Sequence, residues 1–301
     1  MLIIIGVIIL LILVLVGIGY FYGSRHFVVR EETIEFQDLP DEFDGYRICQ
    51  FSDFHAMAFH RGHDEDVQKV VDLINAQHCN LIVFTGDLVT IQANELDGFM
   101  DQLSRLSAPD GVLSVMGNHD YGMYQRRFTK AQRRNDIKDL YRRQRDMGWQ
   151  LLLNEHTSIH RGEDSIVIIG VENDGTPPHF PRFADIKKAM HGIDAGTFQV
   201  MLSHDPTHWR RSIIPETDIQ LTLSGHTHAG QFRLFGWSPV KAVYKEWRGL
   251  YQNTKSDASG HDVVQWLHIS EGVGCVPVPF RIGAWPEICV LTLRKTSNSN
   301  L

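Results

Sequence analysis

Cysteine is scarce in this chain of 301 residues. Cys49, Cys79, Cys275 and Cys289 lie far apart in apolar surroundings, and no two of them form a CxxC pair. This spacing argues against a disulfide scaffold and against a structural zinc site, because both need closely placed cysteines. We therefore expect four buried thiols in a reducing compartment.

Excess positive charge and low-complexity sequence are also lacking. Lys and Arg number 29 against 36 Asp and Glu, a formal net charge of −7, which argues against a broad nucleic-acid surface. The 43% of hydrophobic residues is typical of a globular chain and not of disorder. We expect one large or two small domains, a polar tail over residues 296–301 and no nucleic-acid partner. Nothing in the sequence points to a particular oligomeric state.

The N-terminus carries a long apolar run. Residues 2–22 contain no charge, and about 20 such residues span the hydrocarbon core of a bilayer. A cleaved signal peptide is the alternative, but a basic n-region and an A-x-A site are missing. We therefore expect a transmembrane anchor over residues 1–24, with a juxtamembrane linker and first strand over residues 25–45. Arg25 and Arg30 follow the run, so the positive-inside rule places the globular domain in the cytoplasm.

The rest of the chain alternates predicted strands and helices. Short apolar runs predict strands at 46–51, 81–85, 112–116, 166–171, 198–203, 219–224, 263–269 and 287–293. Helical spacing of apolar residues falls between the first three, at Val67 to Ile74 and at Leu96 to Leu103. The later strands are separated more by loops. This pattern predicts a layered α/β domain with a mixed sheet over residues 46–295.

Polar side chains follow five of the predicted strands. In chain order they are Asp53 and His55, then Asp87, then Asn118, His119 and Asp120, then His204, and finally His226 and His228. Ligands in α/β sheets bind beyond the carboxyl ends of strands, so we expect these residues to converge. Carboxylates, an Asn carbonyl and imidazoles without thiolates suit Mn, Fe or Zn. There are enough of them for two metal ions, a common arrangement for hydrolysis of phosphate esters.

Each motif alone has a structural explanation. An Asp and a His near a strand end can cap a turn, and a single histidine such as His204 can be a packed core residue. Five coincidences in order would be needed, which favours the metal site. The other histidines are expected to have packing or surface roles. His60 and His63 are the exceptions to watch, since their polar loop follows the first motif.

In this order, the motifs DxH, GD, GNHD, an isolated His and GHTH resemble the calcineurin-like metallophosphoesterase superfamily over residues 46–293. GHTHAGQ and the closing ISEGVG, PFR and WPEICVLTL resemble a membrane-anchored bacterial subgroup of UDP-2,3-diacylglucosamine pyrophosphatase type. The resemblance implies an α-β-β-α sandwich of mixed sheets. Glu271 stands where the subgroup usually has Arg, which puts a substrate contact there in doubt.

The resemblance also implies a role for each motif residue. Asp53, His55 and His228 would hold one metal ion, Asn118, His204 and His226 a second, and Asp87 would bridge them. His119 would give a proton to the leaving group, and Asp120 would support the site or orient His119. The expected cofactors are two divalent ions, manganese first, with iron or zinc as alternatives. A hydroxide activated by both ions would attack the phosphorus.

Two further segments suggest a membrane-associated substrate. Residues 126–145 carry nine Lys or Arg against two Asp with apolar residues at helical spacing, and residues 235–251 mix aromatic side chains with cations. Anionic lipid headgroups attract such segments, although a solvated helix face and core packing are the plain alternatives. The loop 176–183 is a third candidate flank of an apolar entrance. With the anchor, these segments predict the lipid bilayer and a phosphorylated amphipathic small molecule as partners.

The subgroup offers one specific substrate, UDP-2,3-diacylglucosamine, a lipid A precursor that would be hydrolysed to UMP and a lipid monophosphate. A phospholipid headgroup, a cyclic nucleotide or a phosphoprotein are alternatives. A non-catalytic scaffold of the same fold is the alternative from another class, but such scaffolds usually lack one or more ligands, and here every ligand position is filled.

Overall fold

The computed structural model describes residues 2–60, 64–176, 180–256, 260 and 262–296. His63, residues 177–179 of the loop expected at an apolar entrance, and residues 297–301 of the expected tail lie outside the described residues.

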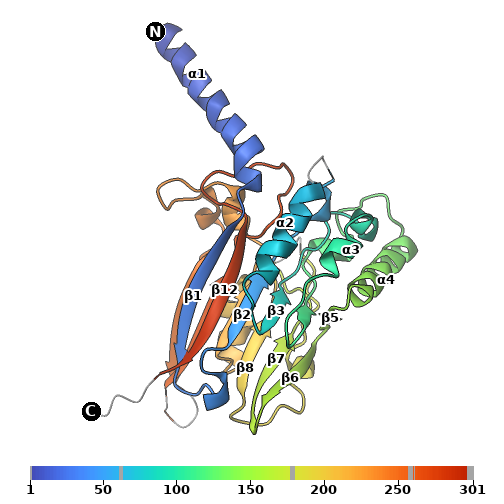
Figure 1. Cartoon of the computed structure of the whole chain (residues 1–301), viewed down its shortest axis with the longest axis vertical. Coiled ribbons are helices and arrows are strands. Elements are labelled where there is room, and N and C mark those ends of the chain that lie inside the picture. Colours follow the sequence, from blue (N-terminus) through green and yellow to red (C-terminus); the bar gives the residue numbers. More distant parts are fainter. Residues whose placement is uncertain (1, 61–63, 177–179, 257–259, 261, 297–301) are drawn as a thin grey trace.

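An apolar helix projects from one end of the molecule (Figure 1). Helix α1 spans Leu2–Gly17 and continues through single turns at Ile18–Tyr22 and Gly23–Arg25. The helical stretch Ile3–Arg25 is long and apolar enough to cross a membrane, with a mean hydropathy of 3.2. A membrane anchor and a signal sequence both have this form.

The first sheet has six strands in the order β1-β12-β2-β3-β4-β5. Their bounds are Val28–Phe36 (β1), Arg47–Phe51 (β2), Leu81–Phe84 (β3), Val112–Ser114 (β4), Gln150–Leu151 (β5) and Glu287–Lys295 (β12). All neighbours are parallel except β12 and β2. The sheet is therefore mixed, as the sequence predicts.

The second sheet also has six strands, in the order β10-β11-β9-β8-β7-β6. Their bounds are Glu155–Arg161 (β6), Asp164–Gly170 (β7), Phe198–Leu202 (β8), Leu221–Ser224 (β9), Gly249–Ser256 (β10) and Asp262–Ile269 (β11). The four central strands run parallel, and each edge strand is antiparallel to its neighbour.

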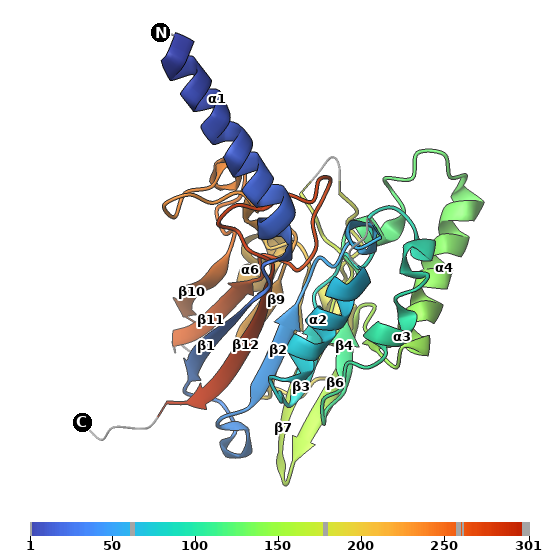
Figure 2. The same ribbon diagram turned by 45° about the horizontal axis from the view of Figure 1, so that its top comes forward.

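Helices cover the outer faces of both sheets (Figures 1 and 2). They are α2 (Asp64–Asn75), α3 (Met100–Leu103) and α4 (Lys130–Asp146) on the first sheet, and α5 (Ile186–Ala189) and α6 (Ile214–Glu216) on the second. One core lies between the sheets, where Ile48 and Val83 pack with Ile168 and Val200. Two further cores lie beneath the helices, and a small fourth cluster contains Ala229, Trp247 and Ala284. These layers confirm the predicted α-β-β-α arrangement.

The structure differs from the predicted elements in detail. The second predicted helix, at Leu96 to Leu103, forms only a short turn at Ala93–Leu96 followed by the four residues of α3. Strands β5, β6 and β10 have no counterpart among the predicted strands. They are edge strands or next to an edge, and their alternation of exposed and half-buried residues gives no continuous apolar run.

Strand register places α1 and the strand-end motifs at the same end of the fold. Arg30 of β1 pairs with Cys289 of β12, and Cys289 pairs with Gln50 of β2. Strand β1 begins just after α1, whereas β2 ends just before Asp53. Neighbouring strands lie about 4.8 Å apart, so the start of β1 and the end of β2 are separated by roughly two strand spacings.

Candidate metal centre

Three overlapping groups of side chains could each hold a metal ion. They are Asp53, His55 and His228, then His55, Asp87 and His119, and then Asp87, His204 and His226. Within each group the ligand atoms lie within 4.8 Å of one another. The strand ends thus bring together residues that are up to 175 positions apart. All of these residues are buried except His119 and His226, which are half-buried.

The backbone turns sharply off each strand to present these side chains. Asp53, His55, Asp87, His226 and His228 all have positive φ angles, between 47° and 75°. Residues other than glycine seldom adopt this left-handed conformation, and such strain gathers at functional sites. The turns also need close backbone contact, since a Cβ on Gly225 would lie 2.3 Å from Asp53 Oδ2.

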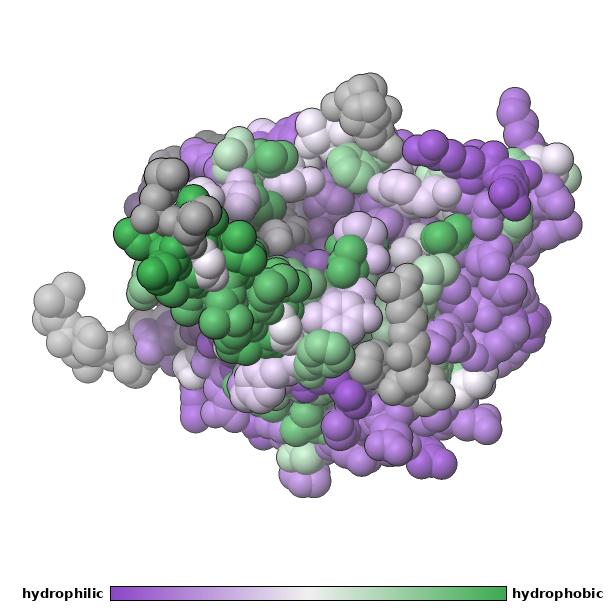
Figure 3. Space-filling view, turned by 90° about the horizontal axis from the view of Figure 1, so that it is seen from above, coloured by the Kyte–Doolittle hydropathy of each residue, from purple (hydrophilic) through white to green (hydrophobic). Residues whose placement is uncertain are grey.

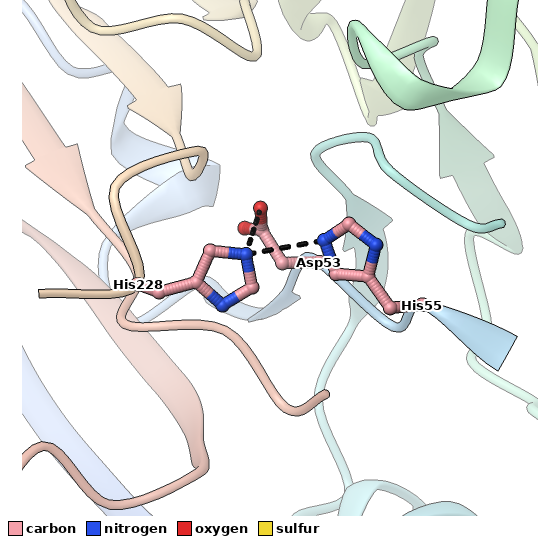
Figure 4. Close-up of side chains that lie close together, drawn as sticks. All are labelled: Asp53, His55 and His228. Carbon is pink, nitrogen blue, oxygen red and sulfur yellow. Dashed lines mark hydrogen bonds and ion pairs between the residues drawn. The ribbon is translucent and has the colours of Figure 1, made fainter. Parts of the chain in front are cut away.

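The first group joins two turns that come from different sheets (Figure 4). His55 Nε2 lies 3.1 Å from His228 Nε2, and His228 Nε2 lies 3.3 Å from Asp53 Oδ1. Both imidazoles point their Nε2 atoms toward the same place. Neutral rings that face each other in this way can share a cation, because each offers a lone pair.

The second group lies around His204 and includes Asn118. His204 Nε2 is 3.1 Å from Asp87 Oδ2, 3.2 Å from Asn118 Oδ1 and 3.2 Å from His226 Nδ1. The other ring nitrogen of His204 lies 2.8 Å from the carbonyl of Thr85, which fixes its tautomer with Nε2 as the free lone pair. His204 thus has the hydrogen bonding of a metal-ligating histidine.

Asp87 connects the two groups. Its Oδ2 lies 3.1 Å from His204 Nε2 and 3.7 Å from His55 Nε2, while its Oδ1 accepts the backbone N–H of His119. The donors fit two divalent cations: hard oxygens and imidazoles converge without thiolates. His55 Nδ1 has no hydrogen-bond partner among the described residues, so the polar contacts of this ring are all made through Nε2. The ligand role of each residue stays a prediction.

Negative charge concentrated among buried imidazoles shifts several pKa values. Burial lowers the pKa of His204, but the Asp87 and Asp53 carboxylates outweigh burial and raise it to about 10. Burial also raises the pKa of Asp53, and the neighbouring His228 outweighs it, so the result lies below the usual range. Burial lowers the pKa of His55 well below its ordinary value. The same negative charge would attract a divalent cation.

His119 and Asp120 have distinct environments. His119 Nδ1 lies 2.7 Å from the carbonyl of Thr90, and its ring stacks on Tyr124 at 4.1 Å between centroids. Thr90, and not Asp120, therefore orients the imidazole. Asp120 is fully buried and accepts N–H groups from the loop of Asp87 and from Gly117. Burial and the Asp87 carboxylate raise its pKa to about 7, whereas those N–H donors favour the ionised form.

Three contacts to the site come from residues outside the predicted set of ligands and catalytic residues. Tyr244 Oη lies 2.8 Å from His226 Nε2, and Tyr124 Oη accepts from the Asn118 amide at 2.8 Å. Arg281 is fully buried, and one of its terminal nitrogens lies 3.2 Å from His228 Nδ1. Tyr124 and Tyr244 belong to loops without periodic sequence, so no pattern places them at the site. Arg281 lies within the PFR motif, which gave the only signal.

The side chain of Glu271 pairs with two arginines. Its carboxylate accepts from Arg248 Nε at 2.5 Å and lies 3.4 Å from an Arg233 nitrogen. The Glu271 side chain is buried, so in this chain its surroundings are those of a residue that supports the fold. His60 likewise packs against Phe99, with its Nε2 atom 2.5 Å from the Glu95 carbonyl.

The basic segment at 126–145 contains helix α4, which begins after a Thr129 cap. Arg142 and Arg143 pair with Asp139 on the same helix. Helix α4 leads into β5, at the opposite edge of the first sheet from β1 and α1. Attraction of α4 to lipid stays a prediction. The segments that lie at the foot of α1 are 280–285 and the loop that follows His228 (Figure 2).

Comparison with known proteins agrees with this site. The family model for calcineurin-like phosphoesterases matches residues 46–230, which include every predicted ligand. The uncharacterized metallophosphoesterase YkuE of Bacillus subtilis is 32% identical over 93% of this chain and 91% of its own length. An uncharacterized metallophosphoesterase of Aquifex aeolicus is 28% identical over 95% of this chain and 99% of its own length.

A zebrafish protein described as a transmembrane protein with a metallophosphoesterase domain is 27% identical over 89% of this chain. The match spans 57% of the zebrafish protein's length. The family model covers most of this chain, and the Bacillus protein matches almost from end to end. The chain belongs to the calcineurin-like phosphoesterase family.

Proposed function

We propose that this protein is a membrane-anchored, metal-dependent hydrolase that cleaves a phosphodiester or pyrophosphate bond of a membrane-associated substrate. The observation that carries the proposal is the pair of ligand groups joined by Asp87, whose Oδ2 lies 3.1 Å from His204 Nε2 and 3.7 Å from His55 Nε2.

The residues divide into two ligand sets. Asp53, His55 and His228 would hold one ion, and Asn118, His204 and His226 the other, with Asp87 shared between them. When bound, two divalent ions, manganese in our proposal, neutralise phosphate charge and lower the pKa of water enough to make it a nucleophile at neutral pH.

His119 is suited to deliver a proton to the leaving group. Its Nδ1 is engaged by the Thr90 carbonyl, so Nε2 is the ring nitrogen available to a substrate. As an imidazolium the ring carries a proton on Nε2, and a histidine in this position can pass that proton to a leaving group as a general acid. The Asp87 carboxylate, which accepts the His119 N–H, fixes the position of this residue relative to the ligands.

The apolar helix supports a substrate that resides in the membrane. We propose that α1 anchors the protein and that the catalytic domain faces the cytoplasm, on the side of Arg25 and Arg30. UDP-2,3-diacylglucosamine is the first specific substrate to test, because a nucleotide diphosphate on a lipid has the amphipathic form that such an enzyme would meet. Its cleavage would give UMP and a lipid monophosphate.

The test is a manganese-dependent hydrolysis assay with mass-spectrometric identification of products. The full-length protein is given UDP-2,3-diacylglucosamine and, separately, a soluble aryl phosphodiester. We expect Asp87→Asn to abolish turnover of both, because it removes the shared charge while keeping an oxygen that can accept the His119 N–H. Asp101→Asn, an exposed carboxylate on α3, is the matched control and should leave the rate unchanged.

Each outcome has a definite meaning. Turnover of the soluble compound alone supports the phosphoesterase and directs the search to other membrane phosphodiesters. Unchanged turnover by Asp87→Asn would refute the metal mechanism. Fewer than about one metal ion per chain after loading with manganese, measured by elemental analysis, would favour the non-catalytic scaffold.

A further inference from the structure

A short turn beside the anchor exposes three large apolar side chains. Residues 234–237, hereafter the docking turn, have the sequence Leu-Phe-Gly-Trp, and all four residues are exposed. Phe235 is 99% exposed and Trp237 55% exposed. Val243, on the same loop, is 76% exposed. Consecutive exposed apolar residues of this size mark a surface that binds something apolar.

The backbone of the docking turn holds Phe235 in an unfavourable conformation. The N–H of Leu234 bonds to the Trp237 carbonyl at 2.9 Å, and the N–H of Trp237 returns to the Leu234 carbonyl at 3.0 Å. Phe235 has a φ of 50° and Gly236 a φ of 76°, the pair of positive values of a type I′ turn. This turn favours Asn or Gly before the glycine, so a bulky Phe here costs stability without gaining any burial.

Hydrogen bonds join the docking turn to the foot of α1. The N–H of Arg281 donates to the Gly19 carbonyl at 3.0 Å, and Tyr22 packs against Trp285. In the same segment, the N–H of Ile282 bonds to the Gln231 carbonyl, and the N–H of Arg233 bonds to the Ile282 carbonyl at 2.7 Å. The apolar helix and the docking turn are thus fixed relative to each other by a single segment, 280–285.

The loop that continues from the docking turn carries net positive charge. Lys241 and Lys245 are exposed, whereas the acidic residue Glu246 is buried and bonded to Arg210. Seen from above, the largest hydrophobic area of this face lies over the projecting helix (Figure 3). An apolar tip flanked by lysines is the pattern of a segment that enters the interface of an anionic bilayer.

The same loop reaches the metal centre. Ser238 Oγ donates to the Ala229 carbonyl at 2.8 Å, next to His228. Farther along, Tyr244 Oη lies 2.8 Å from His226 Nε2. The exposed Trp237 and Tyr244, which contacts the predicted ligand His226, are therefore only seven residues apart.

We propose that the docking turn inserts into the bilayer that α1 spans, with Phe235 at its tip and Lys241 and Lys245 among anionic headgroups. The insertion holds the metal centre at headgroup level, so that a substrate presents its phosphate without leaving the membrane. This inference rests on the proposed function in one respect, that α1 is a membrane anchor. The apolar side chains would lie about 5–10 Å into the interface.

The experiment measures the depth of residue 235. Full-length Phe235→Cys protein is labelled with the fluorophore NBD and placed in nanodiscs of equal parts phosphatidylcholine and phosphatidylglycerol. The four native cysteines are buried and do not compete for the label. Glu163→Cys is the matched control, since Glu163 is exposed in the turn between β6 and β7, at the opposite end of the second sheet from the ligands (Figure 1).

We expect nitroxide attached to the lipid acyl chains to quench most of the emission at Phe235→Cys and little at Glu163→Cys. Iodide in the buffer should show the reverse. If iodide quenches the label at residue 235 as fully as the label at residue 163, the proposal is overturned. A label that neither quencher reaches indicates contact with a second copy of the protein and overturns it as well.

A second variant separates docking from folding. Phe235→Asn places a residue that the type I′ turn favours, so its unfolding temperature should not fall. With the label moved to Val243→Cys, adding Phe235→Asn should reduce nitroxide quenching, and unchanged quenching would contradict insertion of the tip. Neither measurement needs metal or substrate. If the protein hydrolyses no substrate, the quenching result still stands. If the protein is active but the label at residue 235 is exposed to water, membrane insertion of the docking turn is refuted and the proposed function is not.

Discussion

The buried carboxylate of Asp120 accepts a hydrogen bond of 2.9 Å from the backbone N–H of Asp87. The same oxygen accepts from Gly117 at 2.9 Å, and the other oxygen accepts from Leu88 and Val89. Two loops that carry predicted ligands are thus held by a single side chain. Asp120 stabilises the turn at Asp87 by accepting hydrogen bonds from its backbone N–H groups.

Asp120→Asn should weaken metal binding without touching a ligand. An asparagine has one carbonyl oxygen, so its amide would face two N–H donors that now have an acceptor. We expect manganese affinity to fall about 10–100-fold, and the free energy of unfolding to fall by about 1–3 kcal/mol. Calorimetric titration and urea unfolding measure these effects, with Asp101→Asn as control. If Asp120→Asn bound manganese as tightly as the wild type, the two loops would keep their shape without the Asp120 carboxylate.

Gly225→Ala should disable the first ligand group by crowding. A Cβ at Gly225 would lie 2.0 Å from Ser52 Oγ and 2.3 Å from Asp53 Oδ2, so Asp53 must move. We expect manganese affinity to drop by at least about tenfold, with loss of turnover. Gly148→Ala is the control, because its φ of +81° makes alanine costly while nothing lies within 4 Å. That variant should lose about 1–2 kcal/mol of stability and keep its activity.

Arg281→Lys tests how the His228 loop is supported. The guanidinium donates to the carbonyls of Gly274, Glu271 and Ala284 and touches His228 Nδ1. A lysine cannot reach this many acceptors in a planar fork, so carbonyls are left unpaired. We expect about 1–3 kcal/mol loss in the free energy of unfolding and weaker manganese binding. If stability falls while metal affinity does not, the arginine supports the fold and leaves His228 unaffected.

Acid should destabilise the protein through two buried histidines outside the ligand set. Burial and the nearby Arg248 lower the pKa of His268 from 6.5 to about 4, and burial lowers that of His208 to about 4. The unfolded chain therefore binds more protons than the folded one between these values. Stability should fall as the pH drops through this range, by about 1.4 kcal/mol per pH unit for each histidine.

His268→Gln isolates one of these contributions. Glutamine can still donate to the Gln50 oxygen that lies 2.7 Å from His268 Nδ1, but it does not titrate. Urea unfolding at a series of pH values should give a slope that is smaller by about 1.4 kcal/mol per pH unit. An unchanged slope would mean that His268 is accessible to protons in the folded state.

The eight predicted strands all occur, because continuous apolar runs identify strands buried on both faces. The convergence of the strand-end residues followed from topology, since Asp53, Asp87 and His204 each come directly after a predicted strand. Residues that support them could not be predicted in the same way. Asp120 accepts from the backbone N–H of Asp87, which lies 33 positions earlier in the sequence, and Tyr244 contacts His226 from a loop whose path only the fold defines.

The residues 235–251 have different structural roles that their amino-acid composition does not distinguish. Their aromatic and basic character predicted a membrane segment, which stays a prediction. In the structure Trp247 is buried, Tyr244 contacts a ligand, and strand β10 begins at Gly249. Among the large apolar residues of this segment, Phe235, Trp237 and Val243 are the ones that are largely exposed. These residues differ in how deeply the fold buries them, and the sequence pattern does not indicate that difference.

Strands β1, β12 and β2 are joined in a fixed register, in which Arg30 pairs with Cys289 and Cys289 pairs with Gln50. This register fixes the distance between the start of β1 and the predicted metal centre. Lengthening the far ends of these strands would enlarge the domain without moving Asp53 relative to α1. The ten residues from Ile18 to Phe27 are different, because they alone separate the regular helix from the start of β1. Most of this stretch is helical, so each residue inserted within its turns would add about 1.5 Å and would move Gly19 or Tyr22 away from the segment 280–285. Only His26 and Phe27 lie between the last turn and β1, and an extended residue inserted there would add up to about 3.3 Å between the helix and the site.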